Sequence, residues 1–257
     1  MEEIIKLNFE VPEQRKFMRI MAIGDVHYGN RYHDKNMFQR FIKQALKDED
    51  MHILTMGDLI ECANRNSVGL QDQVIPVMEQ IEDITKILEP FADKGRIIGL
   101  LQGNHEDRAM KAAGIDVSRM LATSLDTKYL GNGTILYISI KNENSRRGQN
   151  YTIYGLHGSS AARTAGGKIN ACMRLRDVVD ADLYLHGHVH SLDHHTEELF
   201  VVDRGNLQFK KKHYVLTGSY LKYWGSYAQG KAYPPSGTSG SPKIKLHGDM
   251  KRISVVI

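Results

Sequence analysis

The sequence predicts an α/β fold in which short strands alternate with helices and form a largely parallel sheet. Two observations lead to this prediction. Apolar runs of strand length recur from Met18 to Leu185, and each is followed at once by polar residues. Between them lie segments in which apolar residues return every three or four positions, as on one face of a helix. Strands that alternate with helices form βαβ units, whose strands run parallel.

The elements are expected in a regular order along the chain. The predicted strands are Met18–Ile23, Ile53–Met56, Ile97–Leu101, Ile153–Leu156 and Ala181–Leu185. The predicted helices are Asn36–Leu46, Val74–Leu88, Val117–Leu125 and Ile169–Val179.

The last part of the chain has a different pattern. From Asp193 to Thr217 short β-rich segments, split at Arg204–Asn206 and at Lys210–Lys212, favour a meander. The Pro/Gly/Ser-rich segment Tyr233–Pro242 is expected to be a surface loop, and Ile253–Ile257 a final strand.

Composition excludes several protein classes. The chain has 257 residues with 34 basic and 30 acidic side chains, a net charge of +4, and 41% hydrophobic residues, all ordinary for a globular protein. We therefore expect one domain over residues 1–257 and neither disorder nor a disulfide scaffold. Cys62 and Cys172 have no CxxC partner, and no leader or long apolar run is present, so we expect a cytoplasmic protein that does not engage a membrane.

Polar motifs follow the predicted strands. They are Gly24-Asp25-Val26-His27, Gly57-Asp58, Gly103-Asn104-His105-Glu106, Gly155-Leu156-His157 and His186-Gly187-His188-Val189-His190. Loops that leave the carboxyl edge of an open α/β sheet converge on one crevice, so these residues are expected to meet there. Residues two apart on extended backbone project to the same side, which suits each paired motif to one ion or to two adjacent ions.

The donor set predicts the kind of metal. Two carboxylates, one amide oxygen and four imidazoles, without sulfur, suit Mn, Fe, Zn, Co or Ni better than Ca or structural Zn. Seven ligands are too many for one tetrahedral site. With a bridging carboxylate they could hold two ions about 3.5–4 Å apart, the arrangement used for displacement at phosphorus.

The ordered series D-x-H, G-D, G-N-H-[DE], H and G-H-x-H across residues 25–190 resembles the calcineurin-like metallophosphoesterase superfamily. The resemblance implies a two-sheet α/β sandwich with flanking helices and with metals at the carboxyl edge. It places Asp25, His27 and His190 on one ion and Asn104, His157 and His188 on the other, and Asp58 bridges them. His105 would be the catalytic histidine and Glu61 the residue that orients it, whereas His186 matches no ligand position.

The implied activity is hydrolysis of a phosphodiester of a nucleotide or nucleic acid. Two divalent ions, manganese expected and iron, zinc, nickel or cobalt as alternatives, lower the pKa of a bridging water towards about 7 and so supply hydroxide. Protonation of the leaving oxygen by His105 would contribute about 10²–10⁴-fold. No nucleophilic Ser or Cys motif is present.

One departure from relatives bears on the substrate. Protein Ser/Thr phosphatases of this superfamily carry an arginine at the position of Cys62, and its loss disfavours phosphomonoester dianions relative to diesters. Arg65, on the same loop, is a further candidate cation. Three alternatives stay open: a phosphomonoesterase, a DNA nuclease of the double-strand-break-repair type, and a non-catalytic scaffold such as the retromer's phosphoesterase-like subunit. The presence of His105 argues against a scaffold, and the short segment after His190 favours a small or single-stranded substrate.

Two segments are candidates for substrate contact. The loop Gly158–Lys168 carries Arg163 and Lys168 among small residues, and reads equally as a mobile substrate loop or as a connector. The segment Tyr220–Tyr233 interleaves aromatic residues, among them Tyr223 and Trp224, with lysines. It could stack bases, or its aromatics could pack the core while the lysines face water. Arg146-Arg147 and Lys210–Lys212 are expected to be loop or turn charges.

Overall fold

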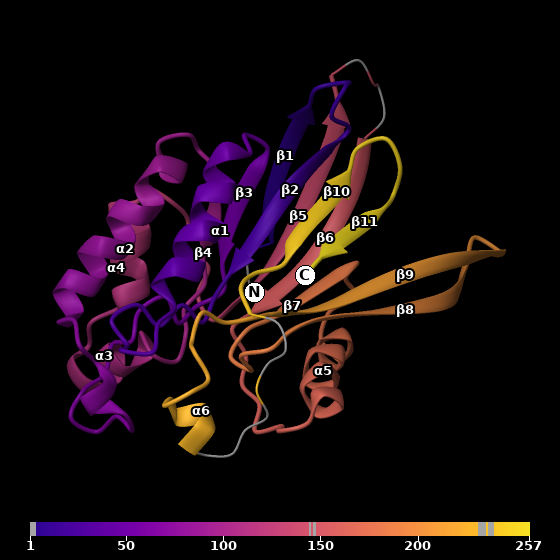
Figure 1. Cartoon of the computed structure of the whole chain (residues 1–257). Helices are drawn as coiled ribbons and strands as arrows, with labels where there is room; N and C mark the ends of the chain where they lie inside the picture. Colours follow the sequence, from indigo (N-terminus) through magenta and orange to yellow (C-terminus); the bar gives the residue numbers. More distant parts are fainter. Residues whose placement is uncertain (1–3, 144, 146–147, 231–234, 236–238) are drawn as a thin grey trace.

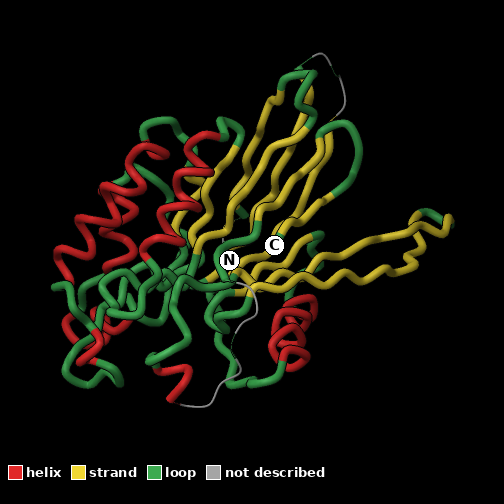
Figure 2. Tube along the Cα trace, in the orientation of Figure 1, coloured by secondary structure: helices red, strands yellow, loops and turns green. Residues whose placement is uncertain are grey.

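Two mixed β-sheets pack face to face in this protein, and helices cover the outer face of each (Figure 1). The same layers are visible in Figure 2, where the strands lie between groups of helices. The computed structural model describes residues 4–143, 145, 148–230, 235 and 239–257. This architecture confirms the α/β sandwich that the resemblance implied.

The five-stranded sheet has the order β11-β10-β2-β3-β4. Its strands are β2 (Phe17–Ile23), β3 (Met51–Thr55), β4 (Ile97–Leu100), β10 (Lys243–His247) and β11 (Ile253–Val256). The first three run parallel, as predicted, while β10 and β11 pair antiparallel. The helices on its outer face are α1 (Lys35–Lys47), α2 (Val77–Ala92) and α4 (Val117–Ser124).

The six-stranded sheet has the order β1-β5-β6-β7-β9-β8. Its strands are β1 (Ile5–Val11), β5 (Gly133–Asn142), β6 (Gly148–Leu156), β7 (Leu183–His186), β8 (Leu192–Asp203) and β9 (Asn206–Thr217). Helix α5 (Ala165–Met173) covers its outer face. The remaining short helices are η1 (Leu70–Asp72), α3 (Asp107–Ala113), η2 (Arg174–Asp177) and α6 (Tyr227–Gly230).

One core joins the two sheets. Alternation along the strands directs Ile20 and Leu54 of the first sheet, and Leu136, Leu183 and Val215 of the second, into a shared cluster of fully buried side chains. Because both sheets bury their inner faces against each other, we propose that the chain forms a single domain.

Several elements differ from the sequence expectations. Strands β1, β5 and β10 and helix α3 were not predicted. Strand β1, for example, alternates apolar with polar residues and contains no continuous apolar run. The helix expected over Ile169–Val179 consists of α5 followed by the tighter turn η2. Half of the expected loop Tyr233–Pro242, and Arg146 and Arg147, lie outside the described residues.

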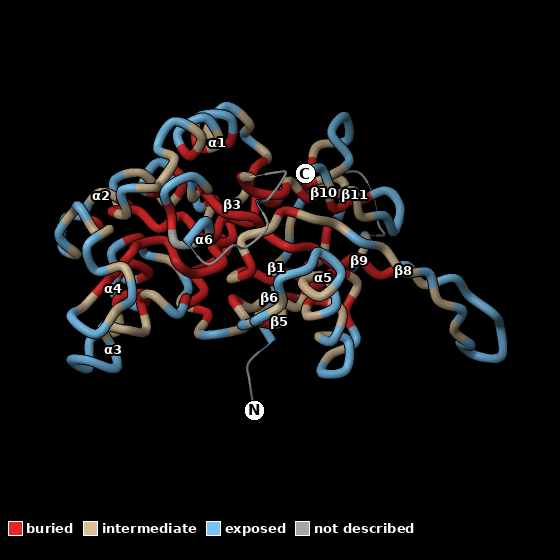
Figure 3. Tube along the Cα trace, turned by 60° about the horizontal axis from the view of Figure 1, so that its bottom comes forward, coloured by how far each residue is buried: buried red, intermediate tan, exposed pale blue. Residues whose placement is uncertain are grey.

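The predicted meander is wrong: β8 and β9 form one long hairpin that turns at Arg204 and Gly205 and projects from the body (Figures 1 and 3). Lys210–Lys212 lie within strand β9 and not in a turn. Lys210 and Lys212 both pair with Asp180, so these charges do not interrupt the strand.

The outer end of this hairpin presents an apolar face. The side chains of Phe200, Val202, Leu207 and Phe209 are 65–75% exposed. They continue the face of β9 that contributes Val215 to the inter-sheet core, but at this distance no described residue covers them. We call these four residues the arm face.

Candidate functional site

Five strand ends bring the predicted ligands together. Asp25 and His27 follow β2, Asp58 follows β3, and Asn104 and His105 follow β4. His157 follows β6 directly, and His188 and His190 follow β7. The site therefore straddles the carboxyl edges of strands from both sheets.

The backbone at these positions is strained. Of the seven predicted ligands, five have positive φ angles between 49° and 64°, a region that non-glycine residues seldom adopt. These five are Asp25, His27, Asp58, His188 and His190. Such strain persists only where the surrounding structure imposes it, and it concentrates at functional sites. The loops are therefore built to aim side chains, at a cost in conformational energy.

Glycines permit the close approach of the loops. A Cβ on Gly103 would lie 2.1 Å from both the backbone nitrogen and Oδ1 of Asp58. Gly57 has φ +85° and would clash with Gly103 and with the His157 ring if it carried a side chain. The glycine that precedes a ligand is thus required by packing against the neighbouring loop.

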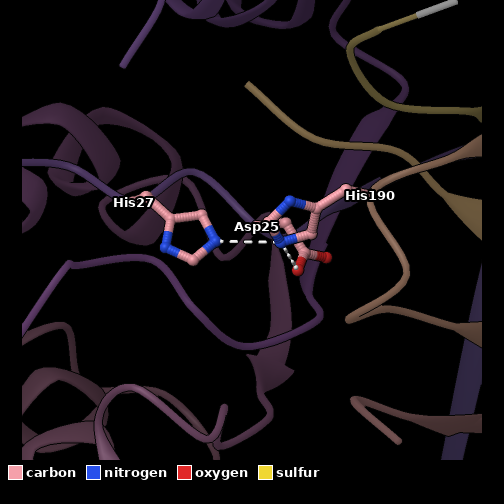
Figure 4. A group of neighbouring side chains, drawn as sticks. All are labelled: Asp25, His27 and His190. Atoms are coloured by element: carbon pink, nitrogen blue, oxygen red, sulfur yellow. Dashed lines mark hydrogen bonds and ion pairs between the residues drawn. The ribbon is translucent and has the colours of Figure 1, made fainter. Parts of the chain in front are cut away.

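The first ligand group comprises Asp25, His27 and His190, whose side chains point toward one another in Figure 4. Nε2 of His27 lies 3.1 Å from Nε2 of His190, which in turn lies 3.1 Å from Oδ1 of Asp25. Asp25 is fully buried, and its Oδ1 accepts no hydrogen bond from the described residues. A buried carboxylate oxygen of this kind, facing two imidazole nitrogens, matches the donor set of a divalent ion.

The second group joins Asp58, His157 and His188, and Asn104 lies among them. Oδ1 of Asn104 is 2.9 Å from Nε2 of His157 and 2.7 Å from Nδ1 of His188. Oδ2 of Asp58 lies 3.4 Å from Nε2 of His157 and 3.8 Å from Nε2 of His27. Asp58 therefore stands between the two groups, where a bridging ligand would have to be.

Outer partners fix the histidine rings. Nδ1 of His157 donates to the carbonyl oxygen of Met56 at 2.8 Å, and Nδ1 of His27 lies 3.2 Å from Oε2 of Glu61. These contacts leave both Nε2 atoms facing the site, as metal ligation requires. His186, in contrast, directs Nδ1 at the Gly187 carbonyl and belongs to neither group.

The carboxylates set the protonation of the site. Burial lowers the pKa of His157, but the Asp58 and Asp25 carboxylates outweigh it and raise that pKa to about 10. Burial raises the pKa of Asp58, yet His105 and His157 together hold it well below its ordinary value. Without metal, positive charge on imidazole balances the buried carboxylate.

His105 lies beside Asp58 and His27, with which it forms a third close set of possible metal donors. Its Nδ1 donates to the carbonyl oxygen of Glu61 at 2.9 Å, and its Nε2 accepts from Nη2 of Arg108 at 2.7 Å. The Glu61 carboxylate is 3.4 Å from Nδ1 of His105 but 3.2 Å from Nδ1 of His27. Glu61 thus orients His105 through its backbone carbonyl, while its carboxylate is shared with His27 and with Asn30.

Two residues of the site escaped sequence reasoning. Glu106 is buried, and its carboxylate accepts four backbone N–H groups, from Asp58, Leu59, Ile60 and Gly103. It lies in the motif Gly103–Glu106, but side chains that bind backbone leave no spacing signal. Arg108 lies outside every motif, and only its position one helical turn after His105 could have pointed to it.

A cavity of about 470 Å³ opens over the ligands. It is lined by His27, Asp58, Asn104, His188 and His190, and by three of the four residues expected to contact substrate. These three are Arg163, Lys168 and Tyr223. Nζ of Lys168 donates to Oγ of Ser191 at 2.7 Å, which anchors the cation beside His190.

The rest of the aromatic segment lies elsewhere. Trp224 is 77% exposed and does not line the cavity, so the structure gives no support to its predicted substrate contact. Tyr220 is fully buried and packs against Phe38, in line with the core alternative. Lys231 and Tyr233 lie outside the described residues.

Among the described helices, none is long and apolar enough to cross a membrane.

Solved structures of similar shape include Vps29 from Entamoeba histolytica in complex with Zn²⁺, at 17% identity and TM-score 0.42, covering 93% of this chain and 98% of that one. A predicted phosphoesterase from Streptococcus pneumoniae has 10% identity and TM-score 0.40, covering 93% and 89%. Chaetomium thermophilum Vps29 has 13% identity and TM-score 0.41, covering 93% and 96%. No curated protein matches the chain. The model of the calcineurin-like phosphoesterase family matches residues 18–192, and the chain belongs to this family.

Proposed function

We propose that this protein hydrolyses phosphodiesters with two divalent metal ions. Both ions are expected to be manganese. The observation that carries the proposal is the convergence of seven nitrogen and oxygen donors from five strand ends, most of them on left-handed backbone. When bound, the ions acidify a water molecule and screen the phosphoryl oxygens. Asp25, His27 and His190 would hold one ion, Asn104, His157 and His188 the other, and Asp58 both.

His105 is the proposed general acid. Its Nδ1 is committed to the Glu61 carbonyl, so Nε2 is the atom that can pass a proton to the leaving oxygen. Burial lowers the pKa of His105, but Asp58 and Glu61 outweigh this and raise it above the ordinary value. This shift favours the protonated form that an acid needs, which Nε2 can adopt only when Nη2 of Arg108 no longer donates to it. A scaffold without catalysis would have no use for this arrangement.

The cavity supports a small substrate. A volume of about 470 Å³ is in the range of small-ligand sites and suits a nucleotide or the end of a single strand better than a duplex. Arg163 and Lys168 would bind phosphate oxygens, and Tyr223 a base. A phosphomonoesterase is the second candidate, because Arg108 places a guanidinium in the cavity. A cytoplasmic location is our proposal from the two buried, unpaired cysteines.

The test compares manganese-loaded wild type with Asp58→Asn on bis(p-nitrophenyl) phosphate. We expect turnover by the wild type and its near loss in the variant, since an amide cannot bridge two cations as a carboxylate does. Asp203→Asn, at the exposed end of β8 beside the hairpin turn, is the matched control and should keep full activity. Full activity of metal-stripped wild type in chelator would contradict the proposal.

A further inference from the structure

The position that carries an arginine in related phosphatases offers no cation here. Cys62 is buried, and its backbone N–H donates to Oε1 of Gln80 at 3.1 Å. Burial raises the pKa of its thiol to about 11, so the side chain is neutral. Arg65, three residues further on, is exposed and does not line the cavity. From this loop, therefore, no positive charge reaches the ligands.

Arg108 brings a guanidinium to the same place from a different element. It lies in the first turn of α3, and its Nη1 donates to the carbonyl oxygen of Glu61, the residue before Cys62, at 3.1 Å. The same Nη1 is 3.4 Å from Oε1 of Glu61, and Nη2 is 2.7 Å from Nε2 of His105. The guanidinium is thus held beside the proposed general acid.

Its charge is only partly balanced. The Glu61 carboxylate is the one acidic group within 4 Å of Arg108 among the described residues, and it also contacts His27, His105 and Asn30. Nε of Arg108 makes no hydrogen bond to any residue that the structure describes. The side chain is 23% exposed, and it lines the cavity together with Asp58 and Asn104. A planar cation with unused donors at the wall of such a cavity suits a phosphate group.

We propose that Arg108 binds a non-bridging oxygen of the phosphate group under attack and gives the site affinity for phosphomonoester dianions as well as diesters. The proposal rests on the proposed function and adds the residue that sets the preference between the two substrate classes. A monoester dianion carries one more negative charge than a diester, so it gains more from the guanidinium.

The contacts of the two Nη atoms of Arg108 indicate how its guanidinium would reach the substrate. In the free protein Nη2 of Arg108 donates to Nε2 of His105 at 2.7 Å. A phosphate oxygen carries negative charge, so its hydrogen bond to the guanidinium gains a Coulomb attraction that an imidazole nitrogen does not offer. Binding of phosphate therefore draws the Nη2 donor from His105, while Nη1 stays on the Glu61 carbonyl.

The experiment uses manganese-loaded wild type, Arg108→Gln, Arg108→Lys and the control Arg65→Gln. Calorimetry measures the affinity for inorganic phosphate, and kinetics measure kcat/KM for p-nitrophenyl phosphate and bis(p-nitrophenyl) phosphate. Metal content and thermal unfolding check that each variant is intact. Should Arg108→Gln fail to fold, Arg108→Lys provides the same comparison, because lysine keeps the positive charge but lacks the paired N–H donors of the guanidinium.

We expect Arg108→Gln to weaken phosphate binding at least tenfold and to lower kcat/KM for the monoester at least tenfold more than for the diester. Arg108→Lys should lie between it and wild type, and Arg65→Gln should stay within twofold of wild type. Unchanged phosphate affinity in Arg108→Gln, or equal losses on both esters, would overturn the proposal. Absence of turnover by metal-loaded wild type would instead contradict the proposed function, and the phosphate titration would still decide the role of Arg108.

Discussion

Glu106→Gln replaces a carboxylate that ties two loops of the site together. Oε1 of Glu106 accepts from the backbone N–H groups of Leu59 and Ile60, and Oε2 accepts from those of Asp58 and Gly103. Glutamine has one oxygen, so its NH₂ group would face two N–H donors. A hydrogen bond to a charged group contributes about 1.5–3 kcal/mol, and losing two predicts a stability loss of about 3–6 kcal/mol.

Burial moderates this estimate. Burial, and then the nearby Asp58 carboxylate, raise the pKa of Glu106 to about 6. The ionised side chain thus carries a desolvation cost that glutamine does not. We therefore expect the lower end of the range, a loss of about 3 kcal/mol in the free energy of unfolding.

Urea unfolding of the metal-free proteins measures this loss, because metal binding would add its own stabilisation. The control is Asp107→Asn, next in the chain, whose carboxylate contacts Lys111 at 2.6 Å on the helix surface. A partly exposed pair of this kind, with the long 3.4 Å hydrogen bond that Asp107 also accepts from Gln102, contributes about 1 kcal/mol. A Glu106→Gln variant whose stability matches that of Asp107→Asn would refute the reasoning.

Three further predictions concern the site and the arm face. His105→Ala should keep both ions and slow hydrolysis of alkyl phosphodiesters by about 10²–10⁴-fold, as measured by kinetics beside metal content; loss of an ion would contradict this. Metal binding near pH 7 should release protons, because the Asp58 and Asp25 carboxylates overcome burial to hold the pKa of His157 at about 10 and a ligand imidazole must be neutral. Affinity should therefore rise with pH, and a binding enthalpy independent of the buffer would contradict it. The double change Phe200→Ser with Phe209→Ser should cost at most about 1.5 kcal/mol in urea unfolding, since the two exposed rings contact chiefly each other, at 4.4 Å between centroids; a larger loss would mean that the arm face is buried.

The strand ends of the site could be predicted from the sequence because each coincides with an abrupt change from apolar to polar residues. Asp25 and Asp58 lie two and three residues beyond neighbouring parallel strands, which brings them to one edge, and packing of the two sheets adds His157 from the end of β6. Pairs such as His188 and His190 add a spacing that few other functions require. The family and the two-sheet architecture followed from that order.

Other features depend on tertiary contacts that leave no local pattern. Glu106 binds backbone, and Arg108 acts through its reach from α3. Strand β1 pairs in parallel with β5, more than a hundred residues away, and because only one of its faces meets the core, its apolar residues alternate with polar ones and form no continuous apolar run. Trp224 has the aromatic side chain expected of a residue that stacks on bases, but in the folded chain this side chain faces solvent.

The most direct test of the two-cation site is a crystal structure of the manganese-loaded protein with anomalous scattering data. We predict two manganese peaks per chain, one among Asp25, His27 and His190 and one among Asn104, His157 and His188, with Asp58 in contact with both. A single peak, or peaks away from these side chains, would contradict the dinuclear centre on which the proposed hydrolysis depends.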